Sequence, residues 1–293
     1  MSSAATIAAI LEGRREGREW RCRCPLHGGR SLLIRDGKDG LLVTCFGGCD
    51  GRDVLAELRR MGLCEAVQQA KRVHSHDHDD ARRRSEYALR IWTQSWQGKG
   101  SLAATYLAGR GLKPDPWPMS LRFHPRCPRM GEPLPALLGL VEHVDRGPIG
   151  VHRTYLKDDG SRKAEVEPNK MMIGSVAGGA VRFAMPVAGE ELAIGEGIES
   201  TLSVAIACSM PAWAALSAGG IEQLILPPEV TLVVICADND SNGVGQRAAN
   251  NAAQRFLREG RSVRIAVPPV SDTDFNDLMI RKQANERRQF QEH

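Results

Sequence analysis

The sequence Leu192-Ala-Ile-Gly-Glu196-Gly-Ile-Glu199-Ser-Thr201 places a glutamate directly after a short apolar run, with a glycine on either side of it. Farther along, Val233-Val-Ile-Cys-Ala-Asp238-Asn-Asp240 places two aspartates after another such run. Short apolar runs that alternate with helical stretches predict a parallel, doubly wound sheet from about residue 190 onward. Ligands bind at the carboxyl ends of the strands in such a sheet, so we expect these acidic residues to gather at one site.

The three carboxylates of this expected site need a compensating charge. Residues of an extended chain alternate in direction, which predicts that Asp238 and Asp240 point the same way. Together with Glu196 they would repel one another, and a divalent cation is the expected compensation. Carboxylate oxygens favour Mg²⁺ or Mn²⁺ over zinc.

Two further acidic positions have alternative interpretations. The stretch Ser271-Asp-Thr-Asp274-Phe-Asn276-Asp277 follows the last apolar run and begins a helix. Asp274 is therefore either a metal ligand or a helix cap, and Asn276 could also be a cap. Glu199 lies one helical turn after Glu196 and is either a partner of the helix dipole or a second ligand.

Four of the eight cysteines lie between residues 20 and 50. Cys24-Pro-Leu-His27 and Cys45-Phe-Gly-Gly-Cys49 form two pairs of ligand residues on either side of a predicted hairpin, with strands at 31–34 and 41–44 and a helix after it at 53–61. This spacing predicts a structural zinc site made by Cys24, His27, Cys45 and Cys49. Cys22 either replaces Cys24 as a ligand or takes no part.

Charge is divided unevenly along the chain. Residues 1–190 hold 30 lysines and arginines against 22 aspartates and glutamates, a balance of +8, whereas residues 191–293 hold 9 against 13, a balance of −4. A basic first part before an acidic metal centre suits a protein that binds a polyanion. No apolar run reaches the roughly 18 residues of a membrane span, and no basic residue precedes the short apolar stretch near Met1, so we expect a cytoplasmic protein that does not bind membranes.

The chain as a whole is predicted to be α/β, or α+β overall, in four parts. They are a zinc-ribbon module at 1–70, a linker and helix at 71–100, a mixed α+β basic core at 101–187 and the doubly wound parallel sheet at 188–285. Helices are expected at 81–96 and 101–108, and strands at 137–144, 148–156 and 171–173. The seven prolines between 114 and 135 predict a break in regular structure there. His74, His76 and His78 are assigned to a solvated linker.

The paired cysteines and the following Asp53-Val-Leu resemble the zinc-binding domain of bacterial and phage DNA primases, which contacts template DNA. That family usually has Cys-Phe-x-Cys-Gly as its second pair, so the extra residue between Cys45 and Cys49 is a departure. A variant of this kind occurs in phage and plasmid primases.

The acidic pattern over about 190–280 resembles the Toprim domain, which occurs in DnaG-type primases, topoisomerases, OLD-family nucleases and recombination mediators. Glu196, Asp238 and Asp240 match its three signature acids. The resemblance implies that they are catalytic and bind Mg²⁺ or Mn²⁺ for phosphoryl transfer, with Asp274 as a further ligand.

The middle region separates these relatives. Tyr106-Leu-Ala-Gly-Arg110-Gly-Leu112 resembles the start of the catalytic core of DnaG-type primases, and Gly150-Val-His152-Arg153-Thr-Tyr155, with Lys163 and Lys170, resembles its basic part. We single out Arg153 and Lys170 as binding residues for a nucleoside triphosphate and the template. The chain has no phosphate-binding loop and none of the separate tyrosine domain of a topoisomerase.

The combination favours a DNA primase of a phage or plasmid, which makes RNA primers on single-stranded DNA from ribonucleoside triphosphates. A helicase would be a separate partner. The alternative is a non-catalytic zinc-finger and Toprim protein that binds DNA in replication or recombination.

Overall fold

The computed structural model describes residues 4–37, 40–45, 49, 51–64, 74–241 and 243–291, apart from the side chains of 74–79 and 286–291. It divides into two units, Met1–Asp79 and Asp80–His293, called unit 1 and unit 2 below. The finer boundaries expected at residues 70, 100 and 187 stay predictions, and the side chains of the three linker histidines lie outside the described part. Within that part, no helix is long and apolar enough to cross a membrane.

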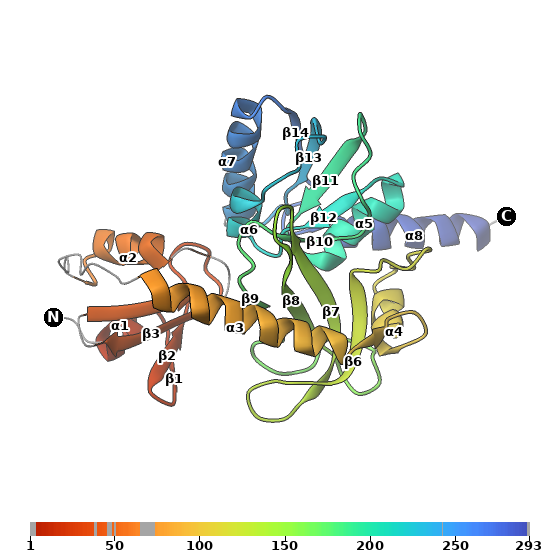
Figure 1. Cartoon of the computed structure of the whole chain (residues 1–293). Coiled ribbons are helices and arrows are strands. Elements are labelled where there is room, and N and C mark those ends of the chain that lie inside the picture. The colour runs from red at the N-terminus through yellow and green to blue at the C-terminus, as the bar shows by residue number, and fades with distance from the viewer. Residues whose placement is uncertain are drawn as a thin grey trace. The chain divides into compact units, whose positions relative to one another are not determined.

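Unit 1 is built on a four-stranded antiparallel sheet in the order β1-β2-β3-β4 (Figure 1). Its elements are α1 (Ala4–Ile10), β1 (Arg14–Glu16), β2 (Glu19–Cys22), β3 (Leu32–Gly37), β4 (Gly40–Cys45) and α2 (Gly51–Arg60). Ile7, Leu32, Ile34 and Leu58 form the centre of a small core. The predicted hairpin and the helix after it are confirmed. The first helix and the first two strands were not predicted. Strands β1 and β2 are mostly charged and show no apolar alternation.

Unit 2 contains one mixed sheet of ten strands, in the order β14-β13-β11-β12-β10-β7-β6-β5, with β8 paired to β7 and β9 paired to β8. Helix α3 (His74–Thr93) leads into it. Its first elements are β5 (Trp96–Gln97), α4 (Leu102–Gly109), β6 (Leu121–Cys127), β7 (Leu134–His143), β8 (Gly147–Tyr155), β9 (Lys170–Gly174) and β10 (Ala180–Arg182). The strands among these pair antiparallel. Of these described strands, only β7 and β8 form a hairpin with a short turn.

The second half of unit 2 alternates strands and helices. Its elements are β11 (Glu191–Gly195), α5 (Ile198–Cys208), β12 (Ala212–Ala214), α6 (Ala218–Gln223), β13 (Leu232–Cys236), α7 (Val244–Arg258), β14 (Ser262–Ala266) and α8 (Phe275–Gln291). The four strands are parallel, in the order β14-β13-β11-β12. The predicted doubly wound parallel arrangement is confirmed. From β11 the chain goes to β12 on one side and later to β13 on the other, so the order reverses between β11 and β13.

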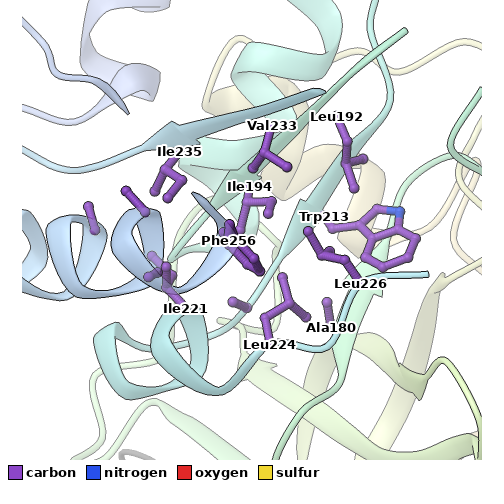
Figure 2. Close-up of a cluster of buried hydrophobic side chains, with 14 of the residues drawn as sticks. Ala180, Leu192, Ile194, Trp213, Ile221, Leu224, Leu226, Val233, Ile235 and Phe256 are labelled. Atoms are coloured by element: carbon purple, nitrogen blue, oxygen red, sulfur yellow. The ribbon is translucent and has the colours of Figure 1, made fainter. Parts of the chain in front are cut away.

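Two layers of helices bury this parallel part. Helix α6 packs against α7 and α5 against α8, and the two pairs cover opposite faces of the strands (Figure 1). Alternate strand residues supply each face, as the pleat requires. Figure 2 shows the α6–α7 side, where the labelled side chains are Ala180, Leu192, Ile194, Trp213, Ile221, Leu224, Leu226, Val233, Ile235 and Phe256. The intervening Ala193, Val234 and Cys236 face the α5 side.

The proline-rich stretch departs from the prediction. A strand, β6, runs through it at Leu121–Cys127 and pairs with β7. Pro125 lies where the register shifts between His124 and Cys127, and such an irregularity is where a strand tolerates a residue without an N–H. The prediction of a break was therefore wrong for this part of the stretch.

Candidate functional site

The predicted zinc ligands of unit 1 come together. The ligand atoms of Cys24, His27, Cys45 and Cys49 all lie within 4.8 Å of one another. The Sγ atoms of Cys24 and Cys49 are 3.8 Å apart, and Nε2 of His27 is 3.1 Å from Sγ of Cys45. Tetrahedral zinc with Zn–S bonds of about 2.3 Å separates two sulfurs by about 3.8 Å, so the donor set and its spacing fit zinc. The chain therefore contains a Cys₃His zinc-binding site.

Cys22 is not part of this group. Its side chain is fully buried in the core of unit 1, where its Sγ lies 3.6 Å from the carbonyl oxygen of Trp20. Burial raises the pKa of the Cys22 thiol to about 11, which disfavours the thiolate that a metal needs. Of the two alternatives for Cys22, the structure favours the one in which it takes no part in zinc binding.

The second site lies where the strand order of unit 2 reverses. Glu196 follows the end of β11 and Asp238 lies two residues beyond the end of β13, the two strands that flank the reversal. Gly195 is needed before Glu196, because a Cβ there would lie 2.3 Å from Oγ1 of Thr201 on α5. The strand can thus turn directly into the helix, with Glu196 at the turn.

A pocket of about 220 Å³ opens at this point. Its lining residues are Arg110, His152, Lys163, Lys170, Glu196, Gly197, Ile198, Glu199, Ser200, Leu216, Asp238 and Asp274. Three are cationic and four are anionic, which gives a net charge of −1. Burial lowers the pKa of His152 to about 3, and the charge of Lys170 adds to this shift, so the imidazole is neutral at pH 7.

Asp238 is held by the hydroxyl of Ser200, which an amide holds in turn. Oγ of Ser200 donates to Oδ1 of Asp238 at 3.0 Å and accepts the backbone N–H of Phe275 at 3.3 Å. Burial raises the pKa of Asp238 to about 6, aided by the nearby charges of Asp274 and Asp240, although the Ser200 hydrogen bond opposes the shift. A bound cation would stabilise the ionised carboxylate and lower its pKa again.

Asp274 combines the two interpretations that the sequence left open. Its Oδ1 accepts the N–H of Asp277 at 2.8 Å, and its own N–H donates to Oδ2 of Asp277 at 3.2 Å, so the pair caps the first turn of α8. Asp274 also lines the pocket. Asn276 does not act as a cap; its amide donates to the carbonyl oxygen of Arg110 and to Oγ of Ser203.

Asp240 lies near Asp238 but does not line the pocket. Its side chain is exposed, and it is not among the lining residues. The expected alternation with Asp238 does not carry it into the pocket, because β13 ends at Cys236 and the carbonyl oxygen of Asp240 accepts the N–H of Gly243 in a turn. The proposed role of Asp240 stays a prediction from the resemblance.

The spacing of the pocket carboxylates limits how they could hold a cation. Among the described residues, only the Cys₃His group has three or more acidic, cysteine or histidine ligand atoms within 4.8 Å of one another. Two ligands of one Mg²⁺ are at most about 4.2 Å apart. No three of the pocket carboxylates are thus close enough to share one ion as they stand. Mg²⁺ often takes one or two carboxylates, waters and substrate phosphates, and this arrangement fits Glu196 and Asp238.

Glu199 lies in the first turn of α5, and its carboxylate is surrounded by a hydroxyl and two ammonium groups. Its side chain is 4% exposed. The hydroxyl of Tyr106 donates to Oε1 at 2.6 Å, Nζ of Lys163 lies 3.0 Å from Oε1, and Nζ of Lys170 lies 3.5 Å from Oε2. Burial alone would raise the pKa of Glu199, but the two lysines and the tyrosine hold it well below its ordinary value.

Of the two cations singled out from the sequence, only Lys170 reaches the pocket. Arg153 is buried and donates from Nη1 to the carbonyl oxygen of Pro128 at 2.9 Å. It is the neighbour of His152 on β8, so the two side chains point to opposite faces of the sheet. Lys163 and Arg110, which the sequence interpretation had not singled out, lie in the pocket instead.

Comparisons with known proteins agree with part of this interpretation. Residues 191–285 match the family model of the Toprim domain, which confirms the predicted Toprim domain. Residues 82–183 match a domain of unknown function (DUF7146). No curated protein matches the chain.

Solved structures similar to this chain include DNA primases. The Aquifex aeolicus primase, in its zinc-binding and RNA polymerase domains, is 16% identical with a TM-score of 0.42; the match covers 99% of this chain and 82% of that one. A DNA primase domain from Pseudomonas aeruginosa is 17% identical with a TM-score of 0.43, over 65% and 71% of the two chains. The DnaG catalytic core is 17% identical with a TM-score of 0.42, over 73% and 78%.

Proposed function

We propose that this protein is a DNA primase that synthesises short RNA primers on single-stranded DNA with the help of Mg²⁺ or Mn²⁺. The observation that carries the proposal is the pocket at the strand reversal of a Toprim domain. There Glu196 and Asp238 lie together with the cations Arg110, Lys163 and Lys170. A separate Cys₃His module in the same chain agrees with it.

Primer synthesis joins the 3′-hydroxyl of one nucleotide to the α-phosphorus of a nucleoside triphosphate, and pyrophosphate leaves. The transferring phosphoryl group needs positive charge around its oxygens, which bound divalent cations supply in such reactions. Glu196 and Asp238 would hold a cation, and Asp240 and Asp274 are further candidates from the sequence. Lys163, Lys170 and Arg110 would pair with the phosphates of the triphosphate.

The charge balance of the pocket supports a substrate that arrives with a cation. The net charge of −1 of the pocket repels a free triphosphate, whereas one divalent cation brings the pocket to +1. The pocket would therefore favour a metal–nucleotide complex over either component alone.

The remaining parts of the proposal concern partners. The zinc module of unit 1 would contact template DNA, as in the primases that the sequence resembles. We also propose that the chain serves a phage or plasmid replication system and works with a separate helicase.

Template-dependent incorporation of ribonucleotides tests the proposal. The full-length protein is given single-stranded DNA of several sequences, four ribonucleoside triphosphates, and Mg²⁺ or Mn²⁺. We expect short RNA products that need both template and cation, and we expect Glu196→Gln to lose them. Glu190→Gln, at an exposed position just before the same strand, is the matched control and should retain synthesis. No product from the unaltered protein on any template would favour the alternative of a non-catalytic DNA-binding protein.

A further inference from the structure

Every oxygen of the Glu199 carboxylate is already engaged. Oε1 receives the hydroxyl of Tyr106 and lies beside Nζ of Lys163, while Oε2 lies beside Nζ of Lys170. With 4% of the side chain exposed, little room is left for a metal or for water. A cation ligand must offer a lone pair toward the ion, and here the two ammonium groups occupy that direction.

The two lysines depend on this contact for their position. They come from separate segments: Lys163 follows the turn after β8, and Lys170 begins β9. Both ammonium groups lie within 3.5 Å of the same carboxylate, so they are also close to each other and repel. Removal of the carboxylate would leave two like charges at one half-buried place and would drive their flexible side chains apart.

The lysines still face the pocket while they bind Glu199. Both line it, and their side chains are 26% and 40% exposed, respectively. An ammonium group has three donors, so each lysine can bind Glu199 and a phosphate oxygen of a ligand at once. Lys163, Lys170 and Glu199 together therefore present a pair of cations at a fixed spacing.

We propose that Glu199 is a positioning residue, which anchors Lys163 and Lys170 as a paired binding site for the polyphosphate of a nucleoside triphosphate, and that it is not a ligand of the cation. The identity of the ligand rests on the proposed function. The inference that Glu199 positions the lysines, whereas other carboxylates of the pocket bind the cation, rests only on the contacts of Glu199 with Tyr106 and the two lysines.

Two binding measurements separate the roles, and neither needs primer synthesis. Mn²⁺ binding to the full chain is followed by titration calorimetry or by electron paramagnetic resonance, and binding of inorganic tripolyphosphate is followed without metal. Glu199→Gln should keep the Mn²⁺ affinity of the unaltered protein. It should weaken tripolyphosphate binding about tenfold, the factor for one charge-assisted hydrogen bond, even though it makes the pocket less negative, because the lysines lose their position. Equal or tighter tripolyphosphate binding by this variant would overturn the proposal. Asp238→Asn should show the opposite pattern. Glu132→Gln, an exposed glutamate outside the pocket, should change neither measurement.

A double-mutant cycle makes the anchoring role specific. Lys163→Gln should weaken tripolyphosphate binding in the unaltered chain, and it should have little further effect in the Glu199→Gln chain, where the lysine is no longer held. Fully additive effects would overturn the proposal. Loss of Mn²⁺ binding in Glu199→Gln equal to that in Asp238→Asn would overturn it as well, since Glu199 would then be a ligand.

A variant that does not fold and a protein that makes no primers are distinguished as follows. If Glu199→Gln does not fold, Lys163→Gln and Lys170→Gln in the unaltered chain carry the test: each should weaken tripolyphosphate binding and leave Mn²⁺ binding unchanged, and the reverse contradicts the proposal. If the unaltered protein makes no primers, the proposed function fails while the two binding measurements still decide the role of Glu199.

Discussion

The hydroxyl of Tyr106, on α4, donates a hydrogen bond of 2.6 Å to the buried carboxylate of Glu199, in the first turn of α5, 93 positions later in the chain. This contact ties the start of the antiparallel part of unit 2 to the helix that follows the first Toprim strand. Burial, together with the adjacent carboxylate, raises the pKa of Tyr106 above its ordinary value, so the tyrosine remains a donor throughout the physiological pH range.

Replacement of this donor should destabilise unit 2. Tyr106→Phe keeps the buried ring and removes one hydrogen bond to a charged acceptor, so we expect a loss of about 1.5–3 kcal/mol in the free energy of unfolding. Urea unfolding followed by tryptophan fluorescence measures it. Tyr87→Phe, at a more exposed tyrosine, is the control and should change the free energy by less than about 0.5 kcal/mol. Equal stability of the two variants would contradict the importance of the contact.

Acid should remove the stabilising effect of Glu199. Its pKa is held below the ordinary value in the folded chain, so its contribution is present above the unfolded pKa of about 4.3 and is lost as the pH falls below it. The difference in unfolding free energy between the unaltered protein and Glu199→Gln should therefore be constant near pH 7 and shrink below about pH 4.3. A difference that is the same at pH 7 and at about pH 3 would show that the ion pairs with the lysines do not stabilise the fold.

Loss of one zinc ligand should unfold unit 1 alone. The core of unit 1 is small, and metal binding supplies about 10–16 kcal/mol in isolated zinc-finger peptides. We expect Cys45→Ser to lose zinc and to become sensitive to protease before about residue 79, while unit 2 keeps its protection. Cys208→Ser, at an exposed cysteine of α5, is the matched control. Full zinc content in the double variant Cys45→Ser/Cys49→Ser would refute the predicted ligands.

Asp238→Asn should eliminate primer synthesis and preserve DNA binding. The substitution keeps the shape of the side chain and removes a hard anionic ligand, and we expect a loss of at least about 10²-fold. The prediction from the resemblance is that Asp240→Asn behaves likewise. Asp158→Asn, at an exposed turn outside the pocket, should retain activity. Primer yield from Asp238→Asn equal to that of the control would remove the Toprim pocket as the active site.

Binding to single-stranded DNA should weaken steeply with salt, because the basic first part of the chain displaces counterions from the phosphates. Each phosphate contact contributes about 0.7 to the slope of log affinity against log salt. Simultaneous change of Arg82, Arg83 and Arg84 to Gln should lower the slope by up to about 2, whereas Arg258→Gln in the acidic part should not change it. Fluorescence anisotropy at 50–200 mM salt measures the slope. The same slope in both variants would mean that the arginine run of α3 makes no phosphate contacts.

The sequence was most informative where local pattern determines placement. Glu196 and Asp238 follow apolar strands, and parallel strands bring their carboxyl ends to one edge, so their meeting could be predicted. Asp240 was harder to place, because alternation applies only while the chain is extended and β13 ends four residues earlier.

Which cations face the pocket depends on how β8 and β9 are aligned with each other, and a single sequence does not reveal that register. Thr154 on β8 pairs with Lys170 on β9, so Lys170 shares a face with His152, whereas Arg153 points to the other face. The partners of Glu199 could not be predicted either, since Tyr106 and Lys163 reach it from segments distant in the chain. Contacts of this kind arise from tertiary packing and leave no local periodicity.

Strand β10 has a consequence for the independence of the Toprim domain. It pairs with β12 on one side and with β7 on the other, so hydrogen bonds run without interruption from the strands that carry the carboxylates to those that carry the lysine side. A fragment that begins at residue 188 would lack this strand and expose β12 as an open edge, ready to pair with another molecule. The smallest fragment that folds as a soluble monomer should accordingly extend back through β7. The strands that carry the carboxylates and those that carry the lysines should therefore be kept together in any transfer of the pocket to another protein.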